Sequence, residues 1–319
     1  WAIAALRQRV AAIAREIAGV RRASDPEPLH RMRVASRRAR AALSLVAGRR
    51  SARRARAWRA DLKRLTRALG EARDLDVHIA FVAEFLARGV EPGWRPGLER
   101  LLLRLRQRRE RRQRRVVAAL DRLDRRETLA AIAAWADGRL SRDPDGAAGA
   151  AGAAARCAAR EALAPLVNDL AARSASLRDP HDEAGHHALR IAAKRLRYAL
   201  EIAAGLDADA VREALRAARE TQRRLGEIHD CDVWVRMLPE FLARERRRTL
   251  RYFGAAAPFA PLKAGLLALR EERARRRAAV FGEFQAYWAE LEARGVWSEA
   301  RHAPRDAGPA APAPAEETP

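Results

Sequence analysis

The sequence predicts an all-α fold in which two tandem four-helix bundles are related by an internal repeat. Three observations support this prediction. Ala, Leu and Arg, which are strong helix formers, dominate the composition, whereas only 5% of the residues are aromatic. Apolar residues recur at spacings of three and four, as one face of a helix requires. Two blocks of sequence also occur twice, in the same order.

The first half of the chain, residues 1–138, is predicted to form successive helices separated by proline and glycine clusters. Its first helix carries an apolar stripe, and Asp25-Pro26 with Pro28 then break the chain. A second turn cluster contains Gly89, Pro92, Gly93 and Pro96. The later helices of this half are expected over residues 29–47, up to 87, over 98–123 and over 129–135.

The second half, residues 153–297, is predicted to repeat this order after a Gly, Asp, Pro and Ala-rich linker at 139–152. We expect helices over 153–174, 182–204 and 208–248, and a last one that ends near 294. Pro258 and Pro261 mark a turn before that last helix. Residues 303–319 are rich in Pro and Ala, and we expect them to be disordered.

The internal repeat is visible residue by residue. LHRMRVASRRARAAL from Leu29 matches HHALRIAAKRLRYAL from His186, and LGEARDLDV from Leu69 matches LGEIHDCDV from Leu225. Equivalent residues lie 157 positions apart in the first pair of blocks and 156 apart in the second. Two blocks in the same order at nearly the same offset make a chance similarity improbable.

The charge indicates a polyanionic partner. The chain has 64 Lys and Arg residues against 41 Asp and Glu residues, a net charge of +23. A large excess of one sign attracts nucleic acid, an anionic membrane surface or a phosphate polymer. Codon bias in a GC-rich genome explains why Arg outnumbers Lys, but it does not explain a basic excess of this size.

The repeated blocks place cations on one helix face. His30, Arg33, Arg37 and Arg40 follow a spacing that confines them to an arc of about 80°. Four stacked cations repel one another, so a bound anion is the natural compensation. A solvated helix face is the alternative, which the duplication makes less favourable. The second copy of this stripe consists of His187, Arg190, Lys194 and Arg197.

The following long helix of each half adds further cations and a glycine. Lys63 and Arg67 are one turn apart, and Gly70 continues the same stripe; the second half has Arg219, Arg223 and Gly226. Glycine inside a helix costs stability, so a close approach of another group is expected there.

Catalytic and metal chemistry are not predicted. Asp74-x-Asp76 and Asp230-x-Asp232 could chelate Mg²⁺, but residues two apart point in opposite directions on a helix. One Asp of each pair is expected to face inward and orient an Arg. No zinc-binding histidine pattern, phosphate loop or nucleophile motif occurs.

Two cysteines and no apolar run of about 18 residues favour a cytoplasmic protein without a membrane partner. The chain starts at Trp1, which leaves room for an upstream segment.

Taken together, the blocks resemble the CHAD family, the conserved-histidine α-helical domain, over about residues 1–297. The resemblance implies two four-helix bundles packed around a basic cavity that binds inorganic polyphosphate, and association with polyphosphate granules. His229 departs from the pattern because it replaces Arg73 of the first half, which would weaken one phosphate contact. The predicted polyphosphate-binding residues are His30, Arg33, Arg37, Arg38, Arg40, Lys63, Arg67, Arg73, His187, Arg190, Lys194, Arg195, Arg197, Arg219 and Arg223.

Two rival functions stay open at this point. A nucleic-acid-binding protein would use the same charge, but the sequence has no recognition module, and Tyr198 is the only aromatic residue in the stripes. A metal-dependent phosphohydrolase would need a carboxylate cluster, which the two Asp pairs supply only if they converge. We therefore expect a non-catalytic polyphosphate-binding protein without cofactors, for which nucleic acid is at most a non-specific partner.

Overall fold

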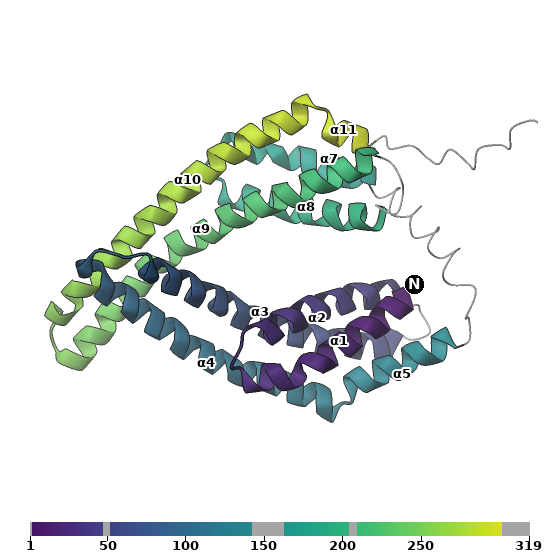
Figure 1. Ribbon diagram of the computed structural model, residues 1–319, viewed down its shortest axis with the longest axis horizontal. Coiled ribbons are helices and arrows are strands. Elements are labelled where there is room, and N and C mark those ends of the chain that lie inside the picture. The colour runs from purple at the N-terminus through teal and green to yellow at the C-terminus, as the bar shows by residue number, and fades with distance from the viewer. Residues whose placement is uncertain (1, 47–51, 142–162, 204–208, 302–319) are drawn as a thin grey trace, which may run out of the picture. The chain divides into compact units, whose positions relative to one another are not determined.

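The computed structural model describes residues 2–46, 52–141, 163–203 and 209–301, and these residues contain helices and turns but no strand (Figure 1). The prediction of an all-α fold is confirmed. The chain divides into two compact units. The first comprises Trp1–Gly152 with Glu245–Ala268, and the second comprises Ala153–Arg244 with Leu269–Pro319. Within the described ranges, no helix combines the length and the apolar character that crossing a membrane requires.

The first unit is a bundle of antiparallel helices (Figure 1). Helix α1 packs against α2 and α5, while α3 packs against α2 and α4. Their shared core is built from the apolar stripes that the sequence predicts, with Leu6, Met32, Leu62 and Leu120 fully buried. The elements are α1 (Ala2–Arg22), α2 (Glu27–Val46), α3 (Ala52–Ala87), η2 (Pro92–Trp94), α4 (Arg95–Arg125) and α5 (Thr128–Leu140).

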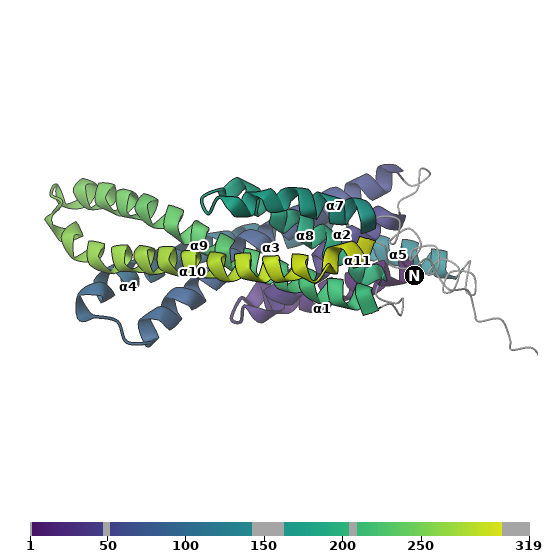
Figure 2. The same ribbon diagram turned by 90° about the horizontal axis from the view of Figure 1, so that it is seen from above.

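The second unit has its own core, to which five helices contribute buried side chains such as Leu196, Leu225 and Phe284. Its two long helices, α9 and α10, run antiparallel to each other (Figure 2). The remaining elements of the chain are α7 (Leu163–Arg173), η3 (Ser174–Arg178), α8 (Glu183–Ala203), α9 (Asp209–Phe253), η4 (Ala257–Leu262), α10 (Lys263–Ala293) and α11 (Val296–Arg301).

The end of α9, η4 and the start of α10 belong to the first unit, although the sequence predicts that residues 153–297 form the second half. Close contact between backbones explains this assignment. A Cβ added to Gly97 of α4 would lie 2.2 Å from the carbonyl oxygen of Leu262, and one added to Gly265 of α10 would lie 2.1 Å from that of Trp94. Only glycine allows the chain to pack this closely.

A buried carboxylate strengthens the same contact. Glu245 of α9 is 1% exposed, yet its oxygens accept hydrogen bonds from Arg104 Nε at 3.1 Å and Arg100 Nη1 at 3.4 Å, both on α4. Arg248, one turn further along α9, also donates to Glu245. A buried acid needs such partners, because removing an ion from water is costly. Glu245 therefore holds this part of α9 against α4.

Most predicted helices occur within a few residues of their expected bounds, as the observed α2, α3, α8 and α10 illustrate. The short helix α11 was not predicted. It follows Gly295, whose φ of +66° ends α10, and its six residues are too few for a periodic pattern. The linker at 139–152 and the tail at 303–319 fall almost entirely outside the described residues. The internal repeat and the basic cavity stay predictions.

Candidate functional site

The first cationic stripe lies on α2 of the first unit. His30, Arg33, Arg37 and Arg40 are all partly buried, because Met32 and Ala39, both 0% exposed, anchor the opposite face of the helix in the core. The Nδ1 atom of His30 is buried and has no hydrogen-bond partner. A polar atom that has lost its water without gaining a partner is unfavourable.

Arg33 lies across Gly70 of α3. The nearest atom that a Cβ on Gly70 would meet is Arg33 Nε at 3.7 Å, an ordinary van der Waals distance, so Arg33 lies beside this position without requiring a glycine. Burial lowers the pKa of Arg33, and the charges of Arg37 and Arg73 lower it further, whereas Asp74 opposes them. The lowered pKa of Arg33 is therefore mainly an effect of its burial.

The second unit carries the same arrangement on α8 and α9. Arg190 lies across Gly226, where an added Cβ would be 4.0 Å from Arg190 Nε. That Nε atom is buried and has no hydrogen-bond partner. At both glycines an arginine is the nearest neighbour, but at a distance that does not require glycine, so the predicted close approach stays a prediction. In each unit, an arginine of the helix that carries the cationic stripe lies beside a glycine of the neighbouring helix.

One difference between the two copies changes a permanent cation into a histidine. Where the first unit has Arg73, the second has His229, whose ring centroid lies 5.4 Å from that of His187. Burial lowers the pKa of His229, and Arg190, His187 and Arg236 lower it further against the opposing charge of Asp232. The second copy therefore contains a titratable group where the first contains a permanent cation. The sequence marks His229 as a departure from the family pattern, and the predicted polyphosphate-binding residues do not include it.

The chain matches a known protein family over most of its length. The family model of the CHAD domain matches residues 4–239, which include both stripes and both glycines. The chain belongs to the CHAD domain family. It is also similar to the crystal structure of the CHAD domain from the plant Ricinus communis, with 29% sequence identity, coverage of 89% of this chain and 90% of that chain, and a TM-score of 0.59. No curated protein matches it.

The predicted site residues of this CHAD domain vary in exposure. Those on the inner faces of the cationic helices are partly buried, and the remainder are exposed to solvent. The partly buried residues are His30, Arg33, Arg37, Arg40, Arg73, Arg190, Lys194 and Arg197. The exposed residues are Arg38, Lys63, Arg67, His187, Arg195, Arg219 and Arg223.

Acidic partners neutralise several of these cations, mostly in the second unit. Arg223 binds Glu220, whose pKa falls to about 2 because Arg223 and Arg224 hydrogen-bond to it. Arg219 and Arg197 both approach Glu201, at 3.5 and 3.9 Å. Arg67 pairs with Glu71 at 3.2 Å, and Arg195 with Asp169 at 4.0 Å. Within the described ranges, His30, Arg33, Arg38, Arg40, Lys63, Arg73, His187 and Arg190 have no carboxylate within 4.0 Å.

One aspartate of each Asp pair forms an ion pair with an arginine. Asp76 accepts a hydrogen bond from Arg109 at 2.6 Å, and Asp232 accepts one from Arg277 at 2.8 Å. Asp74 is exposed. The expectation that one Asp of each pair faces inward and orients an arginine is confirmed. In the part of the chain that the structure describes, no three His, Cys, Asp or Glu residues are grouped so that they could hold a metal ion.

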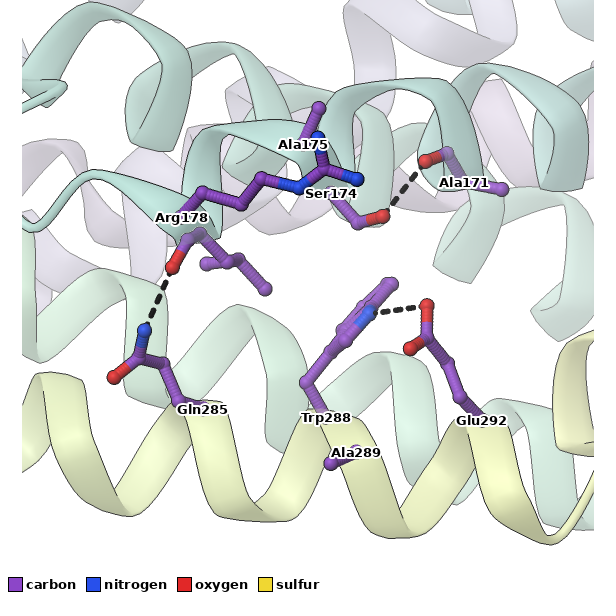
Figure 3. A pocket seen from close by; sticks show the side chains of 9 residues that line it. Ala171, Ser174, Ala175, Arg178, Gln285, Trp288, Ala289 and Glu292 are labelled. Carbon is purple, nitrogen blue, oxygen red and sulfur yellow. Dashed lines mark hydrogen bonds between the residues drawn. The ribbon is translucent and has the colours of Figure 1, made fainter.

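A separate hollow of about 380 Å³ lies in the second unit between α7, η3 and α10 (Figure 3). Trp288 Nε1 donates to Glu292 at 2.8 Å, and Gln285 Nε2 donates to the carbonyl oxygen of Leu177 at 2.7 Å. These polar groups are already paired, and none of the predicted site residues lines the hollow. It is therefore distinct from the cationic stripes.

Proposed function

We propose that this CHAD protein binds inorganic polyphosphate without catalysis, through the cationic helix faces of both halves. The observation that carries the proposal is the duplicated placement of Arg33 on Gly70 and Arg190 on Gly226. In both copies, a partly buried guanidinium lacks a carboxylate partner within the described ranges. A phosphate oxygen would accept hydrogen bonds from these two guanidinium groups in place of a carboxylate.

The chemistry around the stripes favours a polyphosphate over a nucleic acid. Proteins that hold single-stranded nucleic acid combine cations with aromatic rings on which bases stack. Here the stripes contain one aromatic residue, Tyr198, and cations already lie over its ring, with Arg197 4.9 Å and Lys194 5.9 Å from the centroid. Polyphosphate offers only charged oxygens, and arginine clusters are suited to these. Some members of the CHAD family are known to bind polyphosphate, which supports the same proposal.

A competition experiment tests this function. Long-chain polyphosphate should displace RNA and DNA of equal charge, and added salt should weaken its binding steeply. Arg33→Gln should weaken polyphosphate binding, whereas Arg31→Gln is a matched control on the same helix, because Arg31 is paired with Glu16 at 2.9 Å. Equal or tighter binding of RNA, or equal losses in the two variants, would contradict the proposal.

We also propose that the two stripes hold one long chain together. A polyanion bound to one stripe has a high effective concentration at the other, provided that it can reach both. Reversing the charge of either stripe should then weaken the binding of long polyphosphate chains more than the binding of short ones. The double variants to compare are Arg33→Glu with Arg37→Glu and Arg190→Glu with Lys194→Glu. If destroying one stripe leaves the affinity for long chains unchanged, the stripes act separately.

In the cell, this function places the protein in the cytoplasm, at polyphosphate granules. A fluorescent fusion should follow the granules, and the double variants above should lose that distribution while remaining folded. A fusion that stays diffuse in cells rich in polyphosphate would contradict this localisation.

A further inference from the structure

The end of the α9–α10 hairpin carries an exposed apolar surface. Residues 252–262, YFGAAAPFAPL, contain no charged side chain in a chain of which 33% of residues are charged. Tyr252 is 84% exposed and Phe253 is 61% exposed. Helix α9 ends at Phe253, and Gly254 adopts a φ of +67° that turns the chain away. We call residues 252–262 the hairpin tip.

The exposed rings of Tyr252 and Phe253 do not result from poor packing of the hairpin tip. The hairpin tip has its own buried anchors, Phe259 at 4% and Leu262 at 7% exposure. The backbone contacts of Gly97 with Leu262 and of Gly265 with Trp94 brace the tip against α4 and η2. Tyr252 and Phe253 are therefore held outward by a well-anchored segment. Exposed apolar surface of this kind commonly marks an interaction site.

Cations border the aromatic pair. Arg246, Arg247 and Arg251 lie on the last turns of α9, are exposed, and form no ion pair within the described ranges. Lys263 follows the tip on the other side, with its Nζ 5.6 Å from the ring centroid of the anchor Phe259. An apolar end bordered by uncompensated cations is complementary to a surface with an apolar interior and anionic headgroups.

We propose that the hairpin tip docks onto an anionic lipid bilayer. Tyr252 and Phe253 would enter the boundary between headgroups and acyl chains, where amphipathic aromatic rings are favoured. Arg246, Arg247 and Arg251 would contact lipid phosphates, as basic side chains near an anionic surface do. The long aliphatic stems of arginine allow the charged groups to stay at headgroup level while the aromatic side chains go deeper.

The ring geometry favours lipid over single-stranded nucleic acid. The rings of Tyr252 and Phe253 are 4.8 Å apart and meet at 75°, edge to face. Successive bases stack on ring faces that follow the strand, and a perpendicular pair does not present such a platform. This surface is also separate from the polyphosphate site, whose residues lie on α2, α3, α8 and the first half of α9.

Co-sedimentation with vesicles tests the proposal. The full chain should bind vesicles of phosphatidylcholine with phosphatidylglycerol more tightly than vesicles of phosphatidylcholine alone. Tyr252→Ser with Phe253→Ser should weaken binding by about tenfold or more, since two partly buried rings are lost. Leu103→Ser is the matched control, because Leu103 is also exposed, at 48%, but lies on α4.

Three outcomes would overturn the proposal. The serine variant could bind vesicles as tightly as the unchanged chain, in which case charge alone attracts lipid. It could lose binding to single-stranded RNA but not to vesicles, which would make the tip a nucleic-acid contact. It could instead dissociate a dimer, which would make the tip a self-association surface.

If the serine variant does not fold, Tyr252→Trp with Phe253→Trp should bind vesicles more tightly, and a variant without that gain would refute the docking. Polyphosphate binding should be unchanged in both variants, so the two proposals fail separately.

Discussion

The buried ion pair between Asp76 and Arg109 should make a measurable contribution to the free energy of unfolding. Their side chains are 11% and 13% exposed, and the contact distance is 2.6 Å. Opposite charges about 4 Å apart gain roughly 4 kcal/mol at an effective dielectric constant of 20. Burial raises the pKa of Asp76 more than the charge and hydrogen bond of Arg109 lower it, so the desolvation of this carboxylate outweighs what its partner returns.

Asp76→Asn leaves the guanidinium of Arg109 buried without a counter-charge. Removing one partner of a buried pair usually costs about 3–5 kcal/mol, and we expect the lower end because Arg109 also donates to Gln113. Asp74→Asn changes the same charge two residues away, but Asp74 is exposed, so we expect a cost within about 0.5 kcal/mol. Unfolding in urea, followed by circular dichroism, measures both free energies of unfolding.

The double variant Asp76→Asn with Arg109→Gln completes the experiment. Because it leaves no unpaired buried charge, it should recover most of the stability lost in Asp76→Asn. Equal costs for the Asp74 and Asp76 variants, or a double variant as unstable as the single one, would refute the ion-pair interpretation. Destabilisation of the unchanged chain by EDTA would instead favour a metal between the two carboxylates.

Three further predictions concern the anion site. Affinity for polyphosphate should rise as the pH falls and His229 gains a proton, because a bound phosphate favours the protonated form of His229, whose pKa is lowered in the free protein; His229→Arg should flatten a titration of affinity against pH. Gly70→Ala should raise the free energy of unfolding by up to about 1 kcal/mol, since a Cβ at 3.7 Å from Arg33 is an ordinary contact, whereas Gly70→Leu should displace Arg33 and weaken binding. Incubation with polyphosphate and Mg²⁺ or Mn²⁺ should release no orthophosphate, and turnover that is lost in Asp74→Ala would establish the hydrolase function instead.

Local signals in the sequence were sufficient for part of this structure. Helical spacing predicted the buried faces of α2 and α8. The opposite directions of Asp74 and Asp76 followed from the geometry of a helix alone. Each of these depends on residues within a few positions of one another, which is why a single sequence contains them.

Contacts between distant segments could not be predicted in this way. Arg109 and Arg277 are among many arginines on their helices, and nothing in the local pattern selects them as the partners of Asp76 and Asp232. The proximity of His187 and His229 depends on how α8 packs against α9. We expected no membrane partner because no apolar segment was long enough to span a bilayer, and that criterion does not detect a short apolar hairpin tip.

The division of the first unit into two stretches of sequence has a consequence for biosynthesis. Glu245 is 145 residues beyond Arg100, so the arginines of α4 emerge from the ribosome long before their buried acid exists. The closing contacts of Leu262 and Gly265 come later still. During translation, the first bundle therefore lacks these contacts at one end until most of the second unit has been synthesised. For the same reason, a fragment cut after residue 152 would lack the segment that seals it, and we expect it to be more prone to aggregation than the full chain.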